Sequence, residues 1–190
     1  MAKKSLPSLK VTHKGAFSFK DLYGVMYEFL KQNSFTTYDF PEFGGGDDQY
    51  EFYFLVKGSG PKNYKAKWKA KKIVPDTNYF RYTLEIEIEG KGISQKEIVV
   101  DGKKLNVDDG EVTITMKGDL ETDFKKEWEK HWLLKHFQGV YDKRILKEEI
   151  EEEHEGGLMK TLLAFQNTVK RYFRIQGGKE VGGILPQRPG

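Results

Sequence analysis

The sequence predicts a single α+β domain in which an N-terminal helix precedes an antiparallel sheet of about six strands, and a long amphipathic helix or helix pair ends the fold. Three observations predict this class. Apolar residues recur at helical spacing from Phe19 to Leu30, and the same spacing returns after Asp123. Between Tyr50 and Glu89, three segments instead alternate apolar and polar residues, which is typical of an antiparallel sheet with one face in water.

The N-terminal part of the chain is expected to change from disorder to strand to helix. Residues 1–7 carry two lysines and no apolar run, so they predict a disordered basic leader. Residues 9–13 alternate in polarity and predict a short strand. Ser18 is a suitable N-cap for the first helix, because its side chain can accept a hydrogen bond from a backbone N–H group in the first turn, and Asn33 marks the end of that helix.

The middle of the chain alternates strand patterns with turn residues, which predicts a meandering sheet. Strands are expected over residues 50–56, 64–74 and 80–89. Gly90-Lys91-Gly92 then predicts a bend or a bulge. Asp101-Gly102 predicts a tight hairpin, because both residues tolerate the positive φ of a type I′ turn, and a last strand follows from Val112 to Leu120.

Helical periodicity resumes at Asp123 and is interrupted at Gly156-Gly157, after an acidic stretch that opposes the dipole at a helix end. A second helical segment follows, and the last residues are rich in Gly and Pro. The expected organisation is a leader over 1–7, one α+β domain over 8–155, a C-terminal helix over 156–176 and a disordered tail over 177–190.

Composition excludes several classes of protein. The 190 residues fit one domain, and 32 basic against 29 acidic residues do not indicate a nucleic-acid binder when charge is counted over the whole chain. The absence of cysteine excludes disulfides, thiolate nucleophiles and zinc–cysteine sites. No run approaches the ~20 apolar residues of a membrane span, and the N-terminus lacks the apolar core of a signal peptide, so a cytoplasmic location is expected.

The order of elements resembles that of the helix-grip superfamily of START and Bet v 1-like proteins. This resemblance implies a curved antiparallel sheet that wraps a long C-terminal helix and leaves an apolar cavity between them. A weaker resemblance, to small uncharacterised archaeal proteins, rests on Phe80-Arg81-Tyr82, on the hairpin from Asp101 to Lys104 and on a Trp-rich final helix. It implies no activity.

A set of aromatic residues on the expected sheet and helix is the candidate ligand pocket, because binding pockets are mostly apolar and carry a few polar groups. A filled core is the alternative interpretation. The set is Phe52, Phe54, Trp68, Phe80, Tyr82, Trp128 and Trp132.

The C-terminal helix carries an apolar stripe that a complete domain over 8–155 would not need. A protruding apolar stripe is otherwise an exposed patch, so it is the candidate face for a protein partner or a second copy of the chain. The stripe consists of Leu158, Leu162, Phe165, Val169 and Phe173.

Four lysines alternate along one expected strand and form a candidate nucleic-acid face: Lys65, Lys67, Lys69 and Lys71. If the following turn is centred near Asp76, this row faces the region of Glu85, Glu87 and Glu89 on the next strand. In that case the row is a neutralised face of the sheet and not a binding surface.

Catalytic, cofactor and metal sites are not predicted. His131 and His136 are five residues apart, which turns them to different sides of a helix, and the glycines at 44–46 precede a strand and not a helix. Three functions stay open. The first is a non-enzymatic interaction protein whose C-terminal helices engage a protein partner or a second copy. The others are a helix-grip pocket for an apolar small molecule and association with RNA or the ribosome through the lysine strand.

Overall fold

The computed structural model describes residues 2–36, 53–55, 60–74, 79–100, 103–125 and 153–178. Within them lie six strands and two helices, which confirms the α+β class, the antiparallel sheet and the C-terminal helix. The elements are β1 (Ala2–Ser5), β2 (Leu9–Phe17), α1 (Phe19–Gln32), β3 (Tyr53–Leu55), β4 (Lys62–Ile73), β5 (Phe80–Val100), β6 (Lys103–Thr122) and α4 (Gly156–Gly178).

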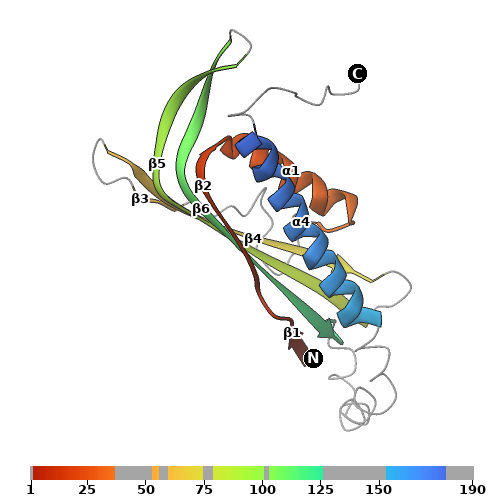
Figure 1. The fold of residues 1–190 in the computed structure, drawn as a ribbon. Helices are drawn as coiled ribbons and strands as arrows, with labels where there is room; N and C mark the ends of the chain where they lie inside the picture. Colours follow the sequence, from red (N-terminus) through yellow and green to blue (C-terminus); the bar gives the residue numbers. More distant parts are fainter. Residues whose placement is uncertain are drawn as a thin grey trace, which may run out of the picture.

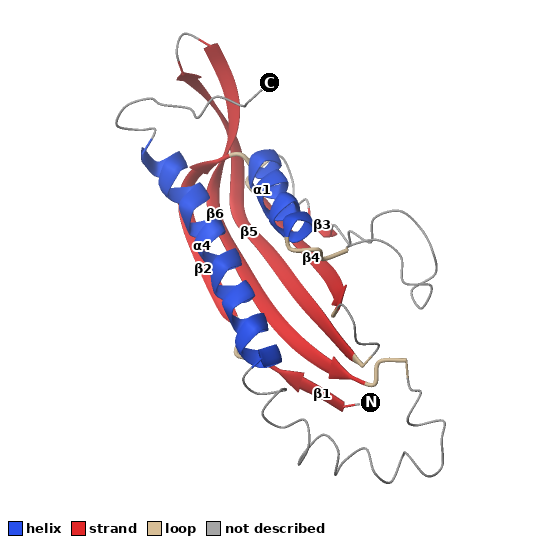
Figure 2. Cartoon of the chain, turned by 90° about the vertical axis from the view of Figure 1, so that its right-hand side faces the viewer, coloured by secondary structure: helices blue, strands red, loops and turns tan. Residues whose placement is uncertain are grey.

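All strand pairs in the sheet are antiparallel, and their order is β3-β4-β5-β6. Both β1 and β2 pair with the other side of β6, one after the other. The two helices lie side by side on one face of this sheet, with α4 along β2 and β6 (Figures 1 and 2). We call the opposite face of the sheet, which is turned away from both helices, the outer face.

The first helix forms for the reasons that its sequence indicates. The Ser18 hydroxyl accepts a hydrogen bond from the backbone N–H of Asp21 at 3.2 Å, which satisfies one of the free donors of the first turn. Leu22, Met26 and Leu30 follow at a spacing of four residues and are buried against the sheet. The helix ends at Gln32, and Asn33 is its C-cap.

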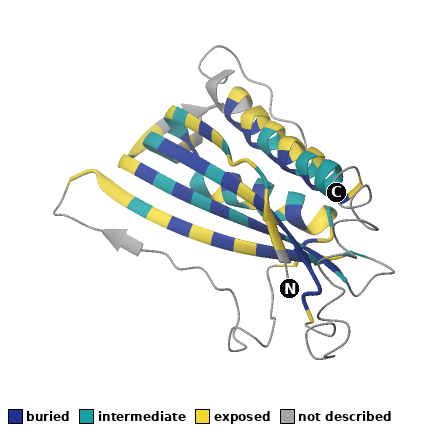
Figure 3. Cartoon of the chain, turned by 90° about the horizontal axis from the view of Figure 1, so that it is seen from below, coloured by how far each residue is buried: buried dark blue, intermediate teal, exposed yellow. Residues whose placement is uncertain are grey.

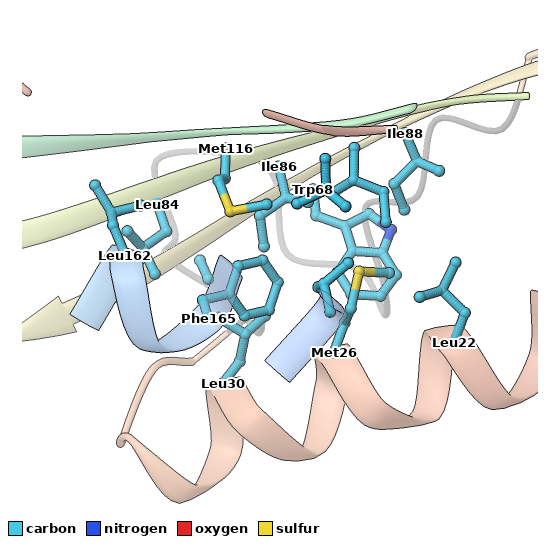
Figure 4. Close-up of a cluster of buried hydrophobic side chains, with 14 of the residues drawn as sticks. Leu22, Met26, Leu30, Trp68, Leu84, Ile86, Ile88, Met116, Leu162 and Phe165 are labelled. Carbon is cyan, nitrogen blue, oxygen red and sulfur yellow. The ribbon is translucent and has the colours of Figure 1, made fainter. Parts of the chain in front are cut away.

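One core fills the space between the sheet and the helices (Figure 4). Strand alternation sends every second residue of β4, β5 and β6 into it, while the intervening residues lie on the outer face (Figure 3). The largest fully buried side chains are Trp68, Phe17, Phe165, Leu22, Met26, Leu30, Leu84, Ile86, Ile88, Ile114, Met116 and Leu120.

The bend predicted at Gly90-Lys91-Gly92 is present, although the chain continues through it as one strand. The β5–β6 register shifts between Lys91 and Ser94, and Gly92 has a φ of +63°, which glycine adopts without steric cost. Beyond the bend the two strands pair up to Val100 and Lys103, as the predicted hairpin at Asp101-Gly102 requires. This ribbon extends past the helices (Figure 1).

Two expectations about the chain ends are wrong. Ala2–Ser5 form a strand and not a disordered leader, because Lys3 and Ser5 both bind the Asp119 carboxylate, at 2.8 and 2.6 Å, beside the β6 edge. The C-terminal helix is not an appendage to a domain that ends at residue 155, because its buried side chains belong to the same core as α1 and the sheet. The expected long helix from Asp123 to Glu155 lies almost wholly outside the described residues. The expected tail over 177–190 begins with two residues of α4, Gly177 and Gly178, and its remainder lies outside the described residues.

Candidate functional site

Helix α4 has two sharply different faces. Its apolar stripe is buried, and the opposite side carries exposed residues that are mostly basic or small. At ~100° per residue, the exposed stripe spans roughly 120° of the helix circumference. It comprises Lys160, Leu163, Ala164, Asn167, Lys170, Arg171 and Arg174.

The charge of the chain is segregated, although its net charge is small. Residues 2–20 and 156–178 together contain nine lysines and arginines and no aspartate or glutamate. Because the whole chain carries +3, all the other residues together carry −6. Charge that is gathered in this way creates a local potential that the net charge does not reveal.

The fold brings these two distant segments together. The Gln166 side-chain amide donates a hydrogen bond to the Lys10 carbonyl oxygen at 3.2 Å, which joins α4 to the edge strand β2. One turn and a half further along α4, the Tyr172 hydroxyl donates to the Ser18 carbonyl oxygen at 2.7 Å. The His13 ring stacks on the Phe173 ring with 4.4 Å between the ring centroids. Helix α4 is therefore fixed along β2 over most of its length.

Only part of this positive charge is neutralised by nearby acids. Lys3 binds Asp119, Lys4 binds Glu155 and Lys14 binds Glu111. The cations of the exposed α4 stripe form no ion pair with a described residue. We call these four residues the basic face: Lys160, Lys170, Arg171 and Arg174.

A glutamine joins one member of the basic face to the backbone of β2. The Lys170 ammonium donates to the Gln166 side-chain oxygen at 3.0 Å, while the amide nitrogen of the same side chain holds the Lys10 backbone. An amide can orient a lysine in this way without cancelling its charge, as a carboxylate would. The Lys170 charge therefore stays available to an anion.

The lysine row on β4 is arranged as the sequence predicts and is neutralised. Its register places Lys65, Lys67 and Lys69 opposite Glu89, Glu87 and Glu85. Lys65 binds both Glu87 and Glu89, whereas Lys67 and Lys69 share Glu85 at 3.5 and 3.4 Å. The Lys65 ammonium accordingly lowers the pKa of the Glu87 carboxyl. The row is an electrically balanced part of the outer face.

The fourth lysine of the row does not share this environment. Lys71 is only 4% exposed, and its backbone pairs with Thr36, the residue that follows the α1 turn. A side chain so deeply buried cannot serve a nucleic acid at the surface. The prediction of a binding face over Lys65, Lys67, Lys69 and Lys71 therefore has no support in the structure.

The apolar stripe of α4 is not a surface that a partner can reach. Its five members, Leu158, Leu162, Phe165, Val169 and Phe173, are all buried in the chain's own core. Phe165 packs against Phe29 of α1, with 5.1 Å between the ring centroids. The structure thus corrects the expectation that these side chains face a protein partner or a second copy: the helix is needed to complete the core.

The aromatic residues proposed to line a pocket are only partly described. Trp68 is 2% exposed and lies within the core (Figure 4). Its ring makes an edge contact with Tyr23 of α1, with 4.7 Å between the ring centroids. Phe80 is equally buried and packs on His154 at 4.0 Å. Phe54 lies on β3, while Phe52, Trp128 and Trp132 fall outside the described residues. Trp68 and Phe80 are packed core residues, and Tyr82 is partly buried against the same core.

One polar pair in this region was not predicted from the sequence. The Tyr82 hydroxyl lies 2.8 Å from Nδ1 of His154, which is buried in the π-helical turn that leads into α4. Burial raises the pKa of the Tyr82 hydroxyl. Because 72 residues separate the two side chains, no local motif indicates the pair. It ties the beginning of α4 to β5.

The described residues contain no group of three His, Cys, Asp or Glu side chains that could hold a metal ion. None of the helices in the described part of the chain is long and apolar enough to cross a membrane.

The chain matches no protein-family model, and no curated protein matches its sequence. Functional inference therefore rests on the basic face, which sequence analysis missed. Counting acidic residues segment by segment, and not over the whole chain, would have revealed it.

Proposed function

We propose that the protein is a non-enzymatic binding protein that associates with a polyanionic partner through the basic face. The observation that carries this proposal is the absence of any acidic residue from the two segments that meet there. On β4, by contrast, the exposed Lys65, Lys67 and Lys69 are neutralised by carboxylates on the next strand. The contrast supports a partner that matches the positive charge of the basic face, because no described residue of the protein does so.

The physical basis of the proposal is the electrostatic field of cations that no described acid neutralises, held on the rigid helix α4. Four cations on one side of a helix attract anions over about one Debye length, roughly 8 Å at physiological ionic strength. Arg171 and Arg174 add planar guanidinium groups, which bind phosphate or sulfate oxygens in a bidentate manner. Because α4 is held against β2 and α1, these side chains start from a fixed backbone and need no folding step on binding.

The test is chromatography on immobilised heparin, a sulfated polyanion, with two variants of equal charge change. K170Q/R174Q removes two cations from the basic face. K65Q/K67Q removes two cations from the neutralised row of β4. We expect the wild-type protein to bind and to elute with salt, K170Q/R174Q to elute at clearly lower salt, and K65Q/K67Q to elute close to the wild type.

Two results would contradict the proposal. One is failure of the wild-type protein to bind heparin at low ionic strength. The other is an equal shift in both variants, which would mean that heparin responds to net charge and not to this surface. Circular dichroism of each variant is the control for folding, and all four side chains are exposed, so we expect unchanged spectra.

A further inference from the structure

We infer that the polyanion is a nucleic-acid duplex, which the basic face contacts through its phosphate backbone. This inference rests on the proposed function and names its partner. It follows from which residues the exposed stripe of α4 contains, which it lacks, and how the helix is held. Each of these points separates a duplex from another class of polyanion.

An anionic membrane is the first alternative, and the burial of α4 argues against it. A basic helix that lies on a bilayer inserts its apolar face among the lipid chains and keeps its cations in the headgroup region. In α4 the apolar face is already occupied by the protein core. The exposed stripe retains one large apolar residue, Leu163, which is 41% exposed. A single leucine does not provide the apolar area that interfacial helices use.

A single-stranded nucleic acid is the second alternative. Proteins that bind single strands combine basic residues with exposed aromatic rings on which unpaired bases stack. The exposed stripe of α4 contains no aromatic residue. The nearest rings, those of Tyr172 and Phe173, are buried. Tyr172 is also engaged with the backbone of Ser18. The basic face can therefore hold phosphates, but it offers no platform for bases.

The length of the stripe fits a duplex backbone. From Lys160 to Arg174 the helix rises by roughly 21 Å, at ~1.5 Å per residue. A DNA duplex presents one phosphate charge per ~1.7 Å of its axis, so the stripe lies beside roughly a dozen phosphates. Asn167, in the middle of the stripe, adds a side-chain donor of a kind that commonly contacts phosphate oxygens.

The way in which α4 is held also predicts how the duplex is recognised. A helix that enters the major groove must project from its domain, so that side chains on several sides can reach base edges. Helix α4 lies flat on the sheet and against α1, and it exposes only one stripe (Figure 2). It can follow a backbone but cannot enter a groove. The binding is therefore independent of base sequence.

The test measures fluorescence anisotropy of labelled probes over a range of salt concentrations. The probes are a DNA duplex, an RNA duplex, one strand of the DNA duplex alone, and a DNA duplex of scrambled sequence. Light scattering with vesicles of phosphatidylcholine and phosphatidylserine completes the set. We expect both duplexes to bind, the scrambled duplex to bind equally, and the single strand and the vesicles to bind more weakly.

The salt dependence is the quantitative readout. Each phosphate contact contributes ~0.9 to the slope of log K against log salt on B-form DNA, so four contacts give a slope of about −3 to −4. K170Q/R174Q should make that slope shallower by about 2 units, and K65Q/K67Q should leave it unchanged. A slope that is equal in the two variants would overturn the inference, because the basic face would then not be the contact surface.

The remaining outcomes separate this inference from the proposed function. If heparin binds through Lys170 and Arg174 but neither duplex binds, the polyanion is of another kind and only the duplex inference falls. Preference for the single strand, or binding of vesicles without binding of a duplex, overturns it in the same way. If heparin does not bind either, both proposals fail.

Discussion

The contact between α4 and β6 leaves no space for a methyl group at Gly118, and this offers a sharp test of the fold. A Cβ atom at position 118 would lie 2.8 Å from Cδ1 of Leu162 and 3.3 Å from Cγ of Leu158. Contacts below 3.0 Å essentially never occur, so Leu162 or the helix must shift. Gly118 does not have a positive φ, so backbone strain plays no part. We expect Gly118→Ala to lower the free energy of unfolding by about 1–3 kcal/mol, as overpacking usually does.

The opposite change at the same contact should also destabilise the protein. Leu162 is fully buried, so Leu162→Ala removes buried carbon and leaves a cavity, at a cost of about 2–5 kcal/mol. In the double variant the methyl group at 118 occupies part of that cavity. The double variant should therefore lose less stability than the sum of the two single losses, with a coupling of about 0.5–3 kcal/mol.

Urea unfolding followed by circular dichroism measures all three variants, with the slope of the transition as a check on two-state behaviour. Leu163→Ala is the matched control: it is the next residue on the same helix, but it is exposed, so it should change stability by less than ~0.5 kcal/mol. If Leu162→Ala cost no more than Leu163→Ala, the apolar stripe would not belong to the core. Additive losses in the double variant would show that the side chains at 118 and 162 do not touch.

Two further predictions concern polar groups. The Arg81 guanidinium binds the Glu121 carboxylate with 2.7 Å between Nε and Oε2, and both residues are buried. Arg81→Met leaves the Glu121 charge buried without its partner, so it should lower the free energy of unfolding by about 3–5 kcal/mol. The double variant R81M/E121L removes both charges and should lose less stability. A double variant less stable than Arg81→Met would contradict this. Burial raises the pKa of Tyr172 to about 12, above its value of ~10 in unfolded chains. Between about pH 10 and 12 the unfolded chain loses the phenolic proton while the folded protein keeps it, so the free energy of unfolding falls as the pH rises through this range. Tyr172→Phe should make this alkaline decline shallower, and an unchanged decline in urea unfolding at several pH values would refute the assignment.

Local features of the chain made much of the sheet and the first helix predictable. The α1 boundaries follow from Ser18 and from apolar spacing, both of which act within a few residues. The register of β4 with β5 follows from alternation and the length of the connecting turn, so the pairing of Lys65 with Glu89 was expected and is confirmed. The glycines at 90 and 92 likewise mark a real bend. In each case the interaction that determines the structure joins residues that are close in the sequence.

Strand β1 could not be predicted, because the groups that hold it are distant in the chain. Ala2–Ser5 lack an apolar alternation, and their partner Asp119 is 114 residues away from Ser5. The apolar stripe of α4 was recognised, but its partner was not. Sequence periodicity shows that a helix has an apolar face and does not show what that face meets. Gly118 gives Leu162 room against β6, but this role can be recognised only from the structure.

Sequence analysis missed the basic face because it also depends on contacts between residues that are distant in the chain. The contacts that bury α4 explain both why the cations lie together and why they point away from the core. Net charge sums over positions, whereas a binding partner experiences only the charges that lie together in space. Residues 2–20 and 156–178 are at opposite ends of the chain, and they become neighbours only because α4 buries its apolar stripe beside β2. That burial leaves α4 one orientation, in which Lys170 and Arg174 point away from the core. Core packing therefore determines where the cations lie, so a variant that loosens α4, such as Leu162→Ala, should weaken polyanion binding even though it leaves every cation in place.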